Sequence, residues 1–294
     1  TIQAPTDSFT VSGSTLTFAS NLSTGDVIDF IMVFGNSLSA GTPTDATVTT
    51  AKLADSAVTA AKITDSTITA AKLASGTVQN QSAFKNLVIN GDMSIAQRST
   101  SVASITGSGY NTVDRYRLEI SSLGTWTQSQ STDVPTGQGF STSLKMDCTT
   151  ADASPGTSDY IFMGQKFEGQ NLQYLKKGTS SAESLTVSFW VYATKTGTNI
   201  CELYDVDNTR KISQAYTISS SNTWEKKTLT FAGDTTGALD NDNGSSLTLL
   251  FWLAAGSNFT SGTLNTSWAS ATNANRAVGQ VNHADSTSNN FYIT

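Results

Sequence analysis

A ten-residue repeat constrains the fold of this chain more than any other feature. Asp45–Ala54, Asp55–Thr64 and Asp65–Ala74 follow one another directly, and Ser75–Val78 begins a fourth copy. An aliphatic residue recurs at every fifth position: Val48, Leu53, Val58, Ile63, Ile68, Leu73 and Val78. A step of five residues rotates a helical side chain by about 140°, and an odd step in a strand reverses its face. Neither regular element keeps these residues on one side.

We therefore expect a composite repeat, with an extended Thr-Val-Thr half and a tighter Ala-Ala-Lys-Leu half. One such chain buries too little apolar surface to offset the entropy lost on ordering. Copies wound around a shared axis would bury the aliphatic residues, and three is the usual number in viral fibres. The tract thus predicts the shaft of a homotrimer, with the seven aliphatic residues on its axis. A disordered linker is the alternative, but a linker needs no strict period.

The charges of the tract and of the whole chain narrow the possible partners. The repeated Asp45, Asp55 and Asp65 balance Lys52, Lys62 and Lys72, and could pair between chains to favour one register. The net charge is −6 and the basic residues are scattered, so no nucleic acid is expected as a partner. No apolar run approaches the roughly 20 residues of a membrane span, so no membrane insertion is expected.

Three segments are expected along the chain. Residues 1–40 alternate, with a hairpin signal in Phe9–Val11, Ser12-Gly13 and Thr15–Phe18, and a further strand over Val27–Phe34. They predict the end of a small β-sandwich bead, since a hairpin and one strand are marginal alone. Residues 41–84 form the shaft. Because the chain opens on Thr1 in mid-pattern, we expect a fragment of a longer protein.

Residues 85–294 predict a β-sandwich of jelly-roll type. Polar turns separate short, often alternating segments, and the fold class expected for the whole chain is therefore mainly β. A helical turn is expected near Gln170–Lys176. The predicted strands are Lys85–Ile89, Asp114–Ile120, Leu144–Cys148, Tyr160–Phe167, Leu185–Ala193, Ile200–Asp205, Lys211–Ile218, Trp224–Phe231 and Leu247–Leu253.

The decapeptides resemble those of tail-fibre proteins from short-tailed bacteriophages, which carry Asp-x-x-Val-Thr-x-Ala-Lys-Leu/Ile-Ala. The segments Phe9–Phe18 and Ser23–Ile28 resemble the beads of the same proteins. Asn86–Met93, Ile95–Arg98 and Val113–Tyr116 resemble the opening of their receptor-binding domains, which are similar to carbohydrate-binding modules. In that family Phe291–Thr294 would lead into another strand, so the resemblance implies that the C-terminus is also cut.

This resemblance implies a structural protein of the virion that attaches to the host surface. Its partners would be two further copies, phage tail or adaptor proteins bound through the missing N-terminal part, and a surface glycan or outer-membrane receptor. It would reside in the phage tail after assembly in the host cytoplasm. A reduced cytoplasmic setting also suits Cys148 and Cys201, which are too few for a disulfide framework and are expected in the core.

Candidate site residues are few. Trp126 and Trp268 lie among Ser, Thr and Asn and are the better candidates for exposed faces that stack on sugar rings, although packing under a loop is the favoured alternative. Trp190 and Trp252 are predicted in the core. Further binding candidates are Tyr110, Tyr204 and Asp207. The one histidine, His283, is expected in an exposed loop. No cofactor is expected.

Metal binding stays open at two places. Asp240–Gly244 faintly matches a calcium loop but is better explained as a polar turn. The resemblance implies a structural calcium near Asp92. Glycan cleavage would need paired carboxylates, for which Glu168, Glu183, Glu202 and Asp205 are available without a defined pair. We therefore expect a non-enzymatic attachment protein; a glycan-degrading tailspike-like enzyme and a secreted bacterial sugar-binding adhesin are the alternatives.

Overall fold

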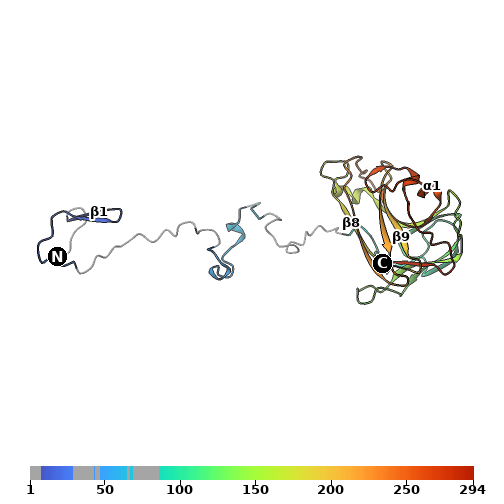
Figure 1. Cartoon of the computed structure of the whole chain (residues 1–294), viewed down its shortest axis with the longest axis horizontal. Helices are drawn as coiled ribbons and strands as arrows, with labels where there is room; N and C mark the ends of the chain where they lie inside the picture. Colours follow the sequence, from blue (N-terminus) through green and yellow to red (C-terminus); the bar gives the residue numbers. More distant parts are fainter. Residues whose placement is uncertain (1–7, 29–42, 44–46, 65–66, 69–85) are drawn as a thin grey trace. The chain divides into compact units, whose positions relative to one another are not determined.

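A computed structural model describes residues 8–28, 43, 47–64, 67–68 and 86–294 (Figure 1). The chain divides into two compact units, Thr1–Asn80 and Gln81–Thr294, and each is described by itself. The boundaries expected near residues 40 and 84 stay predictions.

The N-terminal unit begins with the expected hairpin. Strand β1 (Phe9–Ser12) pairs antiparallel with β2 (Thr15–Phe18), and Phe9 lies opposite Phe18. Gly13 occupies the turn with a φ of 61°, a conformation that glycine adopts without steric cost. Val27 and Ile28, which open the other strand predicted here, are coil, and residues 29–34 lie outside the described residues.

The repeat has the composite local structure that its period predicts. The 3-10 helices η1 (Thr50–Lys52) and η2 (Ala60–Lys62) supply the tight half of two copies. Thr49 and Leu53 on either side of η1 are extended, with φ and ψ of −88° and 164° at Thr49. Each lysine donates a hydrogen bond to a carbonyl five residues earlier, at 2.7 Å from Lys52 and 2.8 Å from Lys62. Pairing of these lysines with aspartates of other chains stays a prediction.

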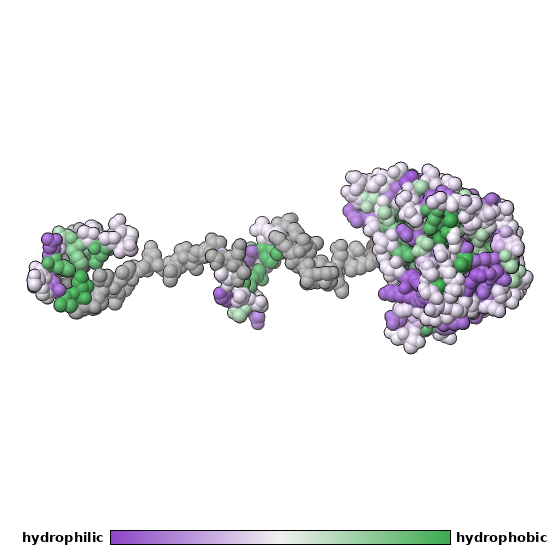
Figure 2. Space-filling model, in the orientation of Figure 1, coloured by the Kyte–Doolittle hydropathy of each residue, from purple (hydrophilic) through white to green (hydrophobic). Residues whose placement is uncertain are grey.

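The aliphatic residues of the repeat are exposed within one chain. Their exposed fractions lie between 39% and 55%, and the described members are Val48, Leu53, Val58, Ile63 and Ile68. Figure 2 shows apolar side chains at the surface of this tract. Leu73 and Val78 lie outside the described residues. The local structure is thus hydrogen-bonded, but it leaves the apolar side chains in water.

The second unit is a sandwich of two six-stranded sheets. The first sheet has the order β13-β10-β9-β12-β7-β4. Its strands are β4 (Arg117–Ser121), β7 (Tyr160–Glu168), β9 (Gly197–Asp205), β10 (Arg210–Ile218), β12 (Ser245–Ala255) and β13 (Ala269–Ser270). The second has the order β11-β8-β14-β6-β5-β3. Its strands are β3 (Ser101–Ile105), β5 (Thr125–Ser131), β6 (Ser143–Thr150), β8 (Leu185–Ala193), β11 (Glu225–Phe231) and β14 (Asn290–Ile293). The mainly β fold is as expected.

Short helical turns connect some of these strands. They are η4 (Gly169–Asn171), η5 (Gln173–Leu175), α1 (Ser257–Thr260) and η6 (Asn273–Asn275). The first two fall within the helical turn predicted at Gln170–Lys176. No helix in the described part of the chain is long and apolar enough to cross a membrane.

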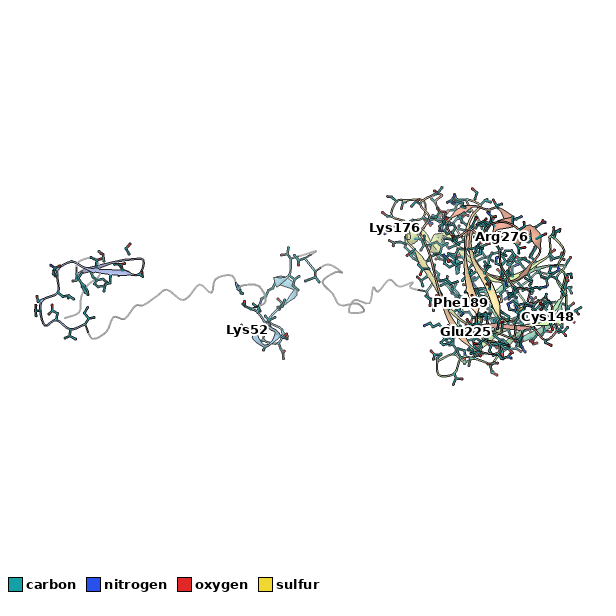
Figure 3. The ribbon with its side chains drawn as sticks, viewed as in Figure 1. Lys52, Cys148, Lys176, Phe189, Glu225 and Arg276 are labelled. Atoms are coloured by element: carbon teal, nitrogen blue, oxygen red, sulfur yellow. The ribbon has the colours of Figure 1, made fainter. Side chains whose placement is uncertain are left out.

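The core lies between the two sheets. It contains Trp126, Met146 and Cys148 from one sheet, and Met163 and Cys201 from the other, all at most 2% exposed. Both cysteines are therefore in the core, as predicted. Figure 3 shows how densely side chains fill the sandwich around Cys148 and Phe189.

A smaller apolar cluster covers the outer face of the first sheet. Trp252 of β12 packs there against Phe259 of α1, with ring centroids 5.6 Å apart, and Ala277 joins them. This cover buries β12 on both faces and explains why its sequence is apolar over most of its length. Trp252 is a core residue, as predicted.

The segment Asn86–Ile89 is coil, which corrects the strand predicted at Lys85–Ile89. The side chain of Gln165 takes the place of a partner strand. Its amide nitrogen donates to the carbonyl of Ile89 and its oxygen accepts from the amide of Ile89, both at 2.8 Å. These two bonds satisfy the backbone without a β-ladder.

Candidate functional site

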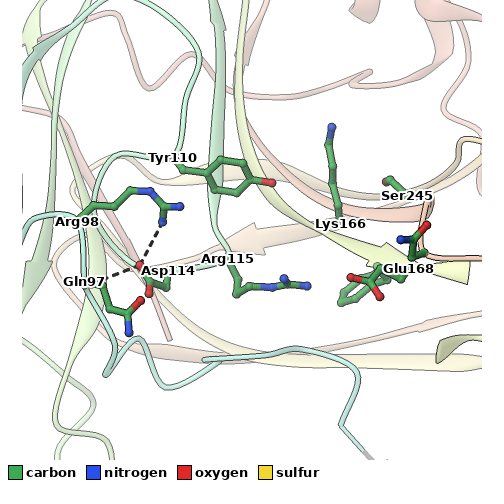
Figure 4. Close-up of a pocket in the computed structure, with 10 residues that line it drawn as sticks. Gln97, Arg98, Tyr110, Asp114, Arg115, Lys166, Glu168 and Ser245 are labelled. Carbon is green, nitrogen blue, oxygen red and sulfur yellow. Dashed lines mark hydrogen bonds and ion pairs between the residues drawn. The ribbon is translucent and has the colours of Figure 1, made fainter. Parts of the chain in front are cut away.

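A polar pocket of about 450 Å³ lies at one end of the sandwich, and Figure 4 shows its walls. Three separate stretches of chain and the ends of two neighbouring strands form it. Its lining residues are Gln97, Arg98, Tyr110, Asp114, Arg115, Lys166, Phe167, Glu168, Asn243 and Ser245.

Two backbone ties bring the lining loops together. The side chain of Asn90 donates to the carbonyls of Ile95 and Asp114 at 2.9 and 3.0 Å, and accepts from the amide of Ile95 at 2.9 Å. Gly109 and Leu118 exchange two 2.9 Å backbone bonds and close the loop that carries Tyr110. Hydrogen bonds therefore hold the pocket loops together, and Met93 and Val113 anchor the same segments in the apolar core.

The aromatic ring of Tyr110 forms one wall and makes cation–π contacts with two arginines. The guanidinium carbons of Arg98 and Arg117 lie 5.5 and 6.0 Å from its centroid. Asp114 holds Arg98 in place through an ion pair of 3.3 Å and accepts from the Gln97 amide at the same distance. Tyr110 is 39% exposed, so a ligand can reach its ring.

The opposite wall comes from the end of β7 and the start of β12. Lys166 is exposed, and Glu168 is half-buried and accepts from the Gln170 side chain at 2.9 Å. The hydroxyl of Ser245 is buried and has no hydrogen-bond partner among the described residues. In Figure 4 the side chain of Arg115 extends from its turn toward Glu168. Donors, acceptors and the aromatic rings of Tyr110 and Phe167 thus meet in one concave space, which suits a ligand with several hydroxyls.

A second cavity of about 730 Å³ has a different character. Apolar side chains of the sandwich interior, including Phe189, Leu249 and Phe251, line much of it. It lies beside residues 185–189 of β8, which pair with β11 on one side but with no described strand on the other. Polar residues such as Asp92 and Lys226 complete its lining.

The structure places one of the five predicted binding residues, Tyr110, in the polar pocket. Trp126 is fully buried, which corrects the predicted exposure, because strand alternation turns it inward and its indole donates to the Leu123 carbonyl at 2.9 Å. Trp268 is half-buried and donates to the Ala232 carbonyl at 2.7 Å. Trp126 is therefore part of the core, and Trp268 packs against the edge of the core.

The other two candidates also lie outside the pocket. Tyr204 packs on Arg276, whose guanidinium carbon is 5.3 Å from the ring centroid. Asp207 is exposed and accepts from the Asp240 amide at 2.9 Å. Trp190 is half-exposed at the second cavity, which corrects its predicted place in the core.

The four carboxylates considered for glycan cleavage are not brought together. Glu202 is fully buried and paired with Arg276 at 2.7 Å, and Asp205 is fully buried and paired with Lys177. Glu183 is paired at the surface with Lys176 at 2.8 Å. Glu168 alone of the four lines the polar pocket.

Neither place considered for a metal carries a cluster of ligating side chains. Across the described ranges no group of three or more His, Cys, Asp or Glu residues could hold an ion. Asp92 instead accepts from the Ser94 hydroxyl at 3.1 Å, and Asp242 accepts from the Gly244 amide at 2.8 Å.

His283 is fully buried, which corrects the exposed position expected from its polar neighbours. Its Nε2 lies 2.7 Å from the side-chain oxygen of Asn199 and its ring packs edge-on against Phe291. Burial and the charge of Lys195 lower the pKa of His283 to about 3, against an opposing effect of Asp285. The folded protein therefore holds a neutral imidazole.

The free energy of unfolding should consequently fall as the pH drops from about 6.5 toward 3. In that window the unfolded chain binds a proton at His283 that the folded chain does not. We expect roughly 2–3 kcal/mol less stability from this group at pH 4.5 than at pH 7. Urea unfolding of the wild type and of His283→Gln at several pH values measures it. If the free energy of unfolding changed equally with pH in both proteins, the assignment of this effect to His283 would be wrong.

The sequence missed most of the pocket as a site. Gln97, Arg98, Asp114 and Arg115 belong to segments noted above for their resemblance to receptor-binding domains, but nothing in the sequence places them beside Lys166 and Glu168. One signal was present in the sequence. Arg98, Asp114 and Arg115 are charged, in a chain in which only 14% of residues are charged.

Comparisons with known proteins find similarity at the level of structure only. No family model matches the chain, and no curated protein matches it. The enzymatically active domain of tailspike protein 4 from bacteriophage CBA120 matches with 15% identity and a TM-score of 0.34, over 71% of this chain and 20% of that one.

Two further matches come from carbohydrate-related proteins. The CBM22-1–GH10 modules of Clostridium thermocellum xylanase 10B, complexed with xylohexaose, match with 13% identity and a TM-score of 0.29, over 65% of this chain and 27% of that one. A CBM4 structure matches with 13% identity and a TM-score of 0.26, over 57% of this chain and 89% of that one. The chain thus spans well under a third of the first two proteins. At these scores the similarity carries no argument about chemistry.

The expectation of a non-enzyme is corrected, because two of the three matches belong to enzymes. The tailspike domain is described as enzymatically active and the other protein as an endo-1,4-β-D-xylanase.

Proposed function

We propose that this chain is part of a trimeric attachment fibre of the bacteriophage tail-fibre type, and that its sandwich binds a glycan on the host surface. The observation that carries the proposal is the series of exposed aliphatic residues in the repeat, 39–55% exposed at every fifth position. When neighbouring chains cover such regularly spaced apolar side chains, the burial stabilises the assembly. Attachment to a phage tail would then occur through other parts of the fibre.

The polar pocket supports the glycan-binding part of the proposal. A sugar ring offers an apolar face and several hydroxyls, and the pocket offers the exposed Tyr110 ring beside Gln97, Asn243 and Ser245. Three copies in one fibre raise the effective concentration of a weak site. A trimer can therefore bind a polysaccharide tightly even though each pocket binds weakly.

Tyr110→Ala tests the pocket directly. Removing the ring face should weaken binding to host cells, or to their isolated surface polysaccharide, about tenfold or more, because aromatic contacts contribute about 0.5–1.5 kcal/mol per site and act in three linked copies. Surface plasmon resonance on immobilised polysaccharide measures the change.

Tyr174→Ala is the matched control, since Tyr174 is 46% exposed and lies on η5 outside the pocket. It should bind like the wild type. Equal loss in both variants, or no loss in Tyr110→Ala, would remove the pocket from the proposed function.

A further inference from the structure

The polar pocket holds cations that no carboxylate neutralises. Nine of the thirteen lysines and arginines of the described sandwich form ion pairs. Among the described sandwich residues, those without a carboxylate within 4.0 Å are Arg115, Lys166, Lys211 and Lys226. Lys211 is buried and donates to the Thr272 carbonyl. Arg115 and Lys166 both line the polar pocket, whereas Lys226 lines the second cavity.

The charge balance of the pocket is positive in a chain that is negative overall. Arg98, Asp114 and Arg115 line one side of the pocket, Lys166 and Glu168 line the other, and Asp114 already neutralises Arg98. One positive charge therefore remains there, although the chain carries a net −6. An anionic group that reaches this space gains charge-assisted hydrogen bonds without displacing an existing ion pair.

The backbone at Arg115 is held in an unfavourable conformation. Its φ of 75° is the largest positive value among the described non-glycine residues. A side chain with Cβ is crowded there, so the surrounding structure must impose the conformation. The neighbouring bond from the Asp114 amide to the Ile95 carbonyl, 2.9 Å, is part of that constraint. The turn thereby keeps the Arg115 guanidinium at the pocket.

We infer that the pocket selects a sugar that carries an anionic group, a carboxylate or a phosphate, which binds between Arg115 and Lys166. This rests on the proposed glycan-binding function and adds the class of ligand. Tyr110, which is 39% exposed, then contacts the sugar ring. A neutral sugar would leave the remaining positive charge of the pocket uncompensated.

The test uses the full chain and a purified acidic polysaccharide from the host surface, immobilised in three forms. One is native, one has its carboxylates reduced to alcohols, and one is dephosphorylated with hydrofluoric acid. We expect the native form to bind at least tenfold more tightly than one of the treated forms, and the form that loses binding identifies the anion. Raising the salt concentration should weaken native binding.

Variants assign the effect to the two cations. Arg115→Gln and Lys166→Gln should each lower affinity for the native polymer about tenfold and leave affinity for the form that lost the anion unchanged. Lys226→Gln removes an equal charge outside the pocket and should bind like the wild type. Thermal unfolding of each variant shows that the fold is retained.

Other outcomes overturn the inference in distinguishable ways. Equal binding to all three forms, or equal loss with Lys226→Gln, would contradict the anion preference and leave glycan binding intact. Absence of binding to every form, with wild-type protein that is folded, would contradict the proposed function itself.

Discussion

Replacing Lys177 with methionine should lower the free energy of unfolding of the sandwich by about 3–5 kcal/mol. The Lys177 ammonium is ion-paired with Asp205 and lies 3.0 Å from Asp234, and these two carboxylates are 0% and 3% exposed. It also donates to the carbonyls of Thr236 and Gly237 at 3.2 and 2.9 Å. Methionine fills similar space but leaves two buried carboxylates without this cation.

Neighbouring charges compensate only part of this loss. Burial raises the pKa of Asp234, but hydrogen bonds from Arg210 and Lys177 outweigh burial and keep the pKa below its ordinary value. Arg210 lies 2.7 Å from Asp234, so we expect it to keep partly neutralising that carboxylate in the variant. Asp205 would keep only neutral donors such as Asn208.

Lys176→Met is the control for this prediction, because Lys176 forms an exposed pair with Glu183 whose side chains are both 54% exposed. Such a pair contributes about 0–1 kcal/mol. Urea unfolding monitored by tryptophan fluorescence compares the two variants. Similar midpoints for Lys177→Met and the wild type would show that the buried cation does not stabilise the fold.

Replacing Val58 and Ile63 together with serine should dissociate the proposed trimer. Each side chain is roughly half exposed in one chain, so covering the remainder stabilises the assembly by about 1 kcal/mol per side chain. Six side chains change in a trimer, which weakens association by roughly 6 kcal/mol, on the order of 10⁴-fold. Light scattering coupled to gel filtration measures the mass.

Thr49→Ser with Thr59→Ser is the matched control, since both positions are exposed in the same tract and off the aliphatic series. This variant should keep the wild-type mass. Dissociation of both variants, or of neither, would show that the aliphatic residues are not the contact between chains.

The regular strands could be predicted because alternation is local. Leu185–Ala193 has the bounds that its apolar and polar alternation predicts, with Phe189 and Val191 turned inward. The strand at Thr125–Ser131 was missed because serine, threonine and glutamine occupy most of it. Trp126 faces the core there, so its polar neighbours misled the prediction of exposure.

The buried charges could not be predicted, because their partners are distant in the chain. Glu202 is stabilised by Arg276, and Asp205 by Lys177, and neither spacing has a local signature. His283 likewise depends on Asn199. Sequence patterns report which residues alternate, but they do not report which segments meet.

The polar pocket illustrates the same limit. Tyr110 was a candidate on composition alone, whereas Arg115 and Lys166 become a pair only when the turn before β4 meets the end of β7. The repeat is the opposite case, since its five-residue period predicted a tight half in each copy, and the 3-10 helices η1 and η2 supply it in two of them.

The central claim is that the aliphatic series of the repeat is covered by two further copies of the chain. The molar mass of the wild-type chain at micromolar concentration, from light scattering or sedimentation velocity, tests it most directly. We expect a single species of about three times 31.0 kDa. A stable species of 31.0 kDa under those conditions would contradict it.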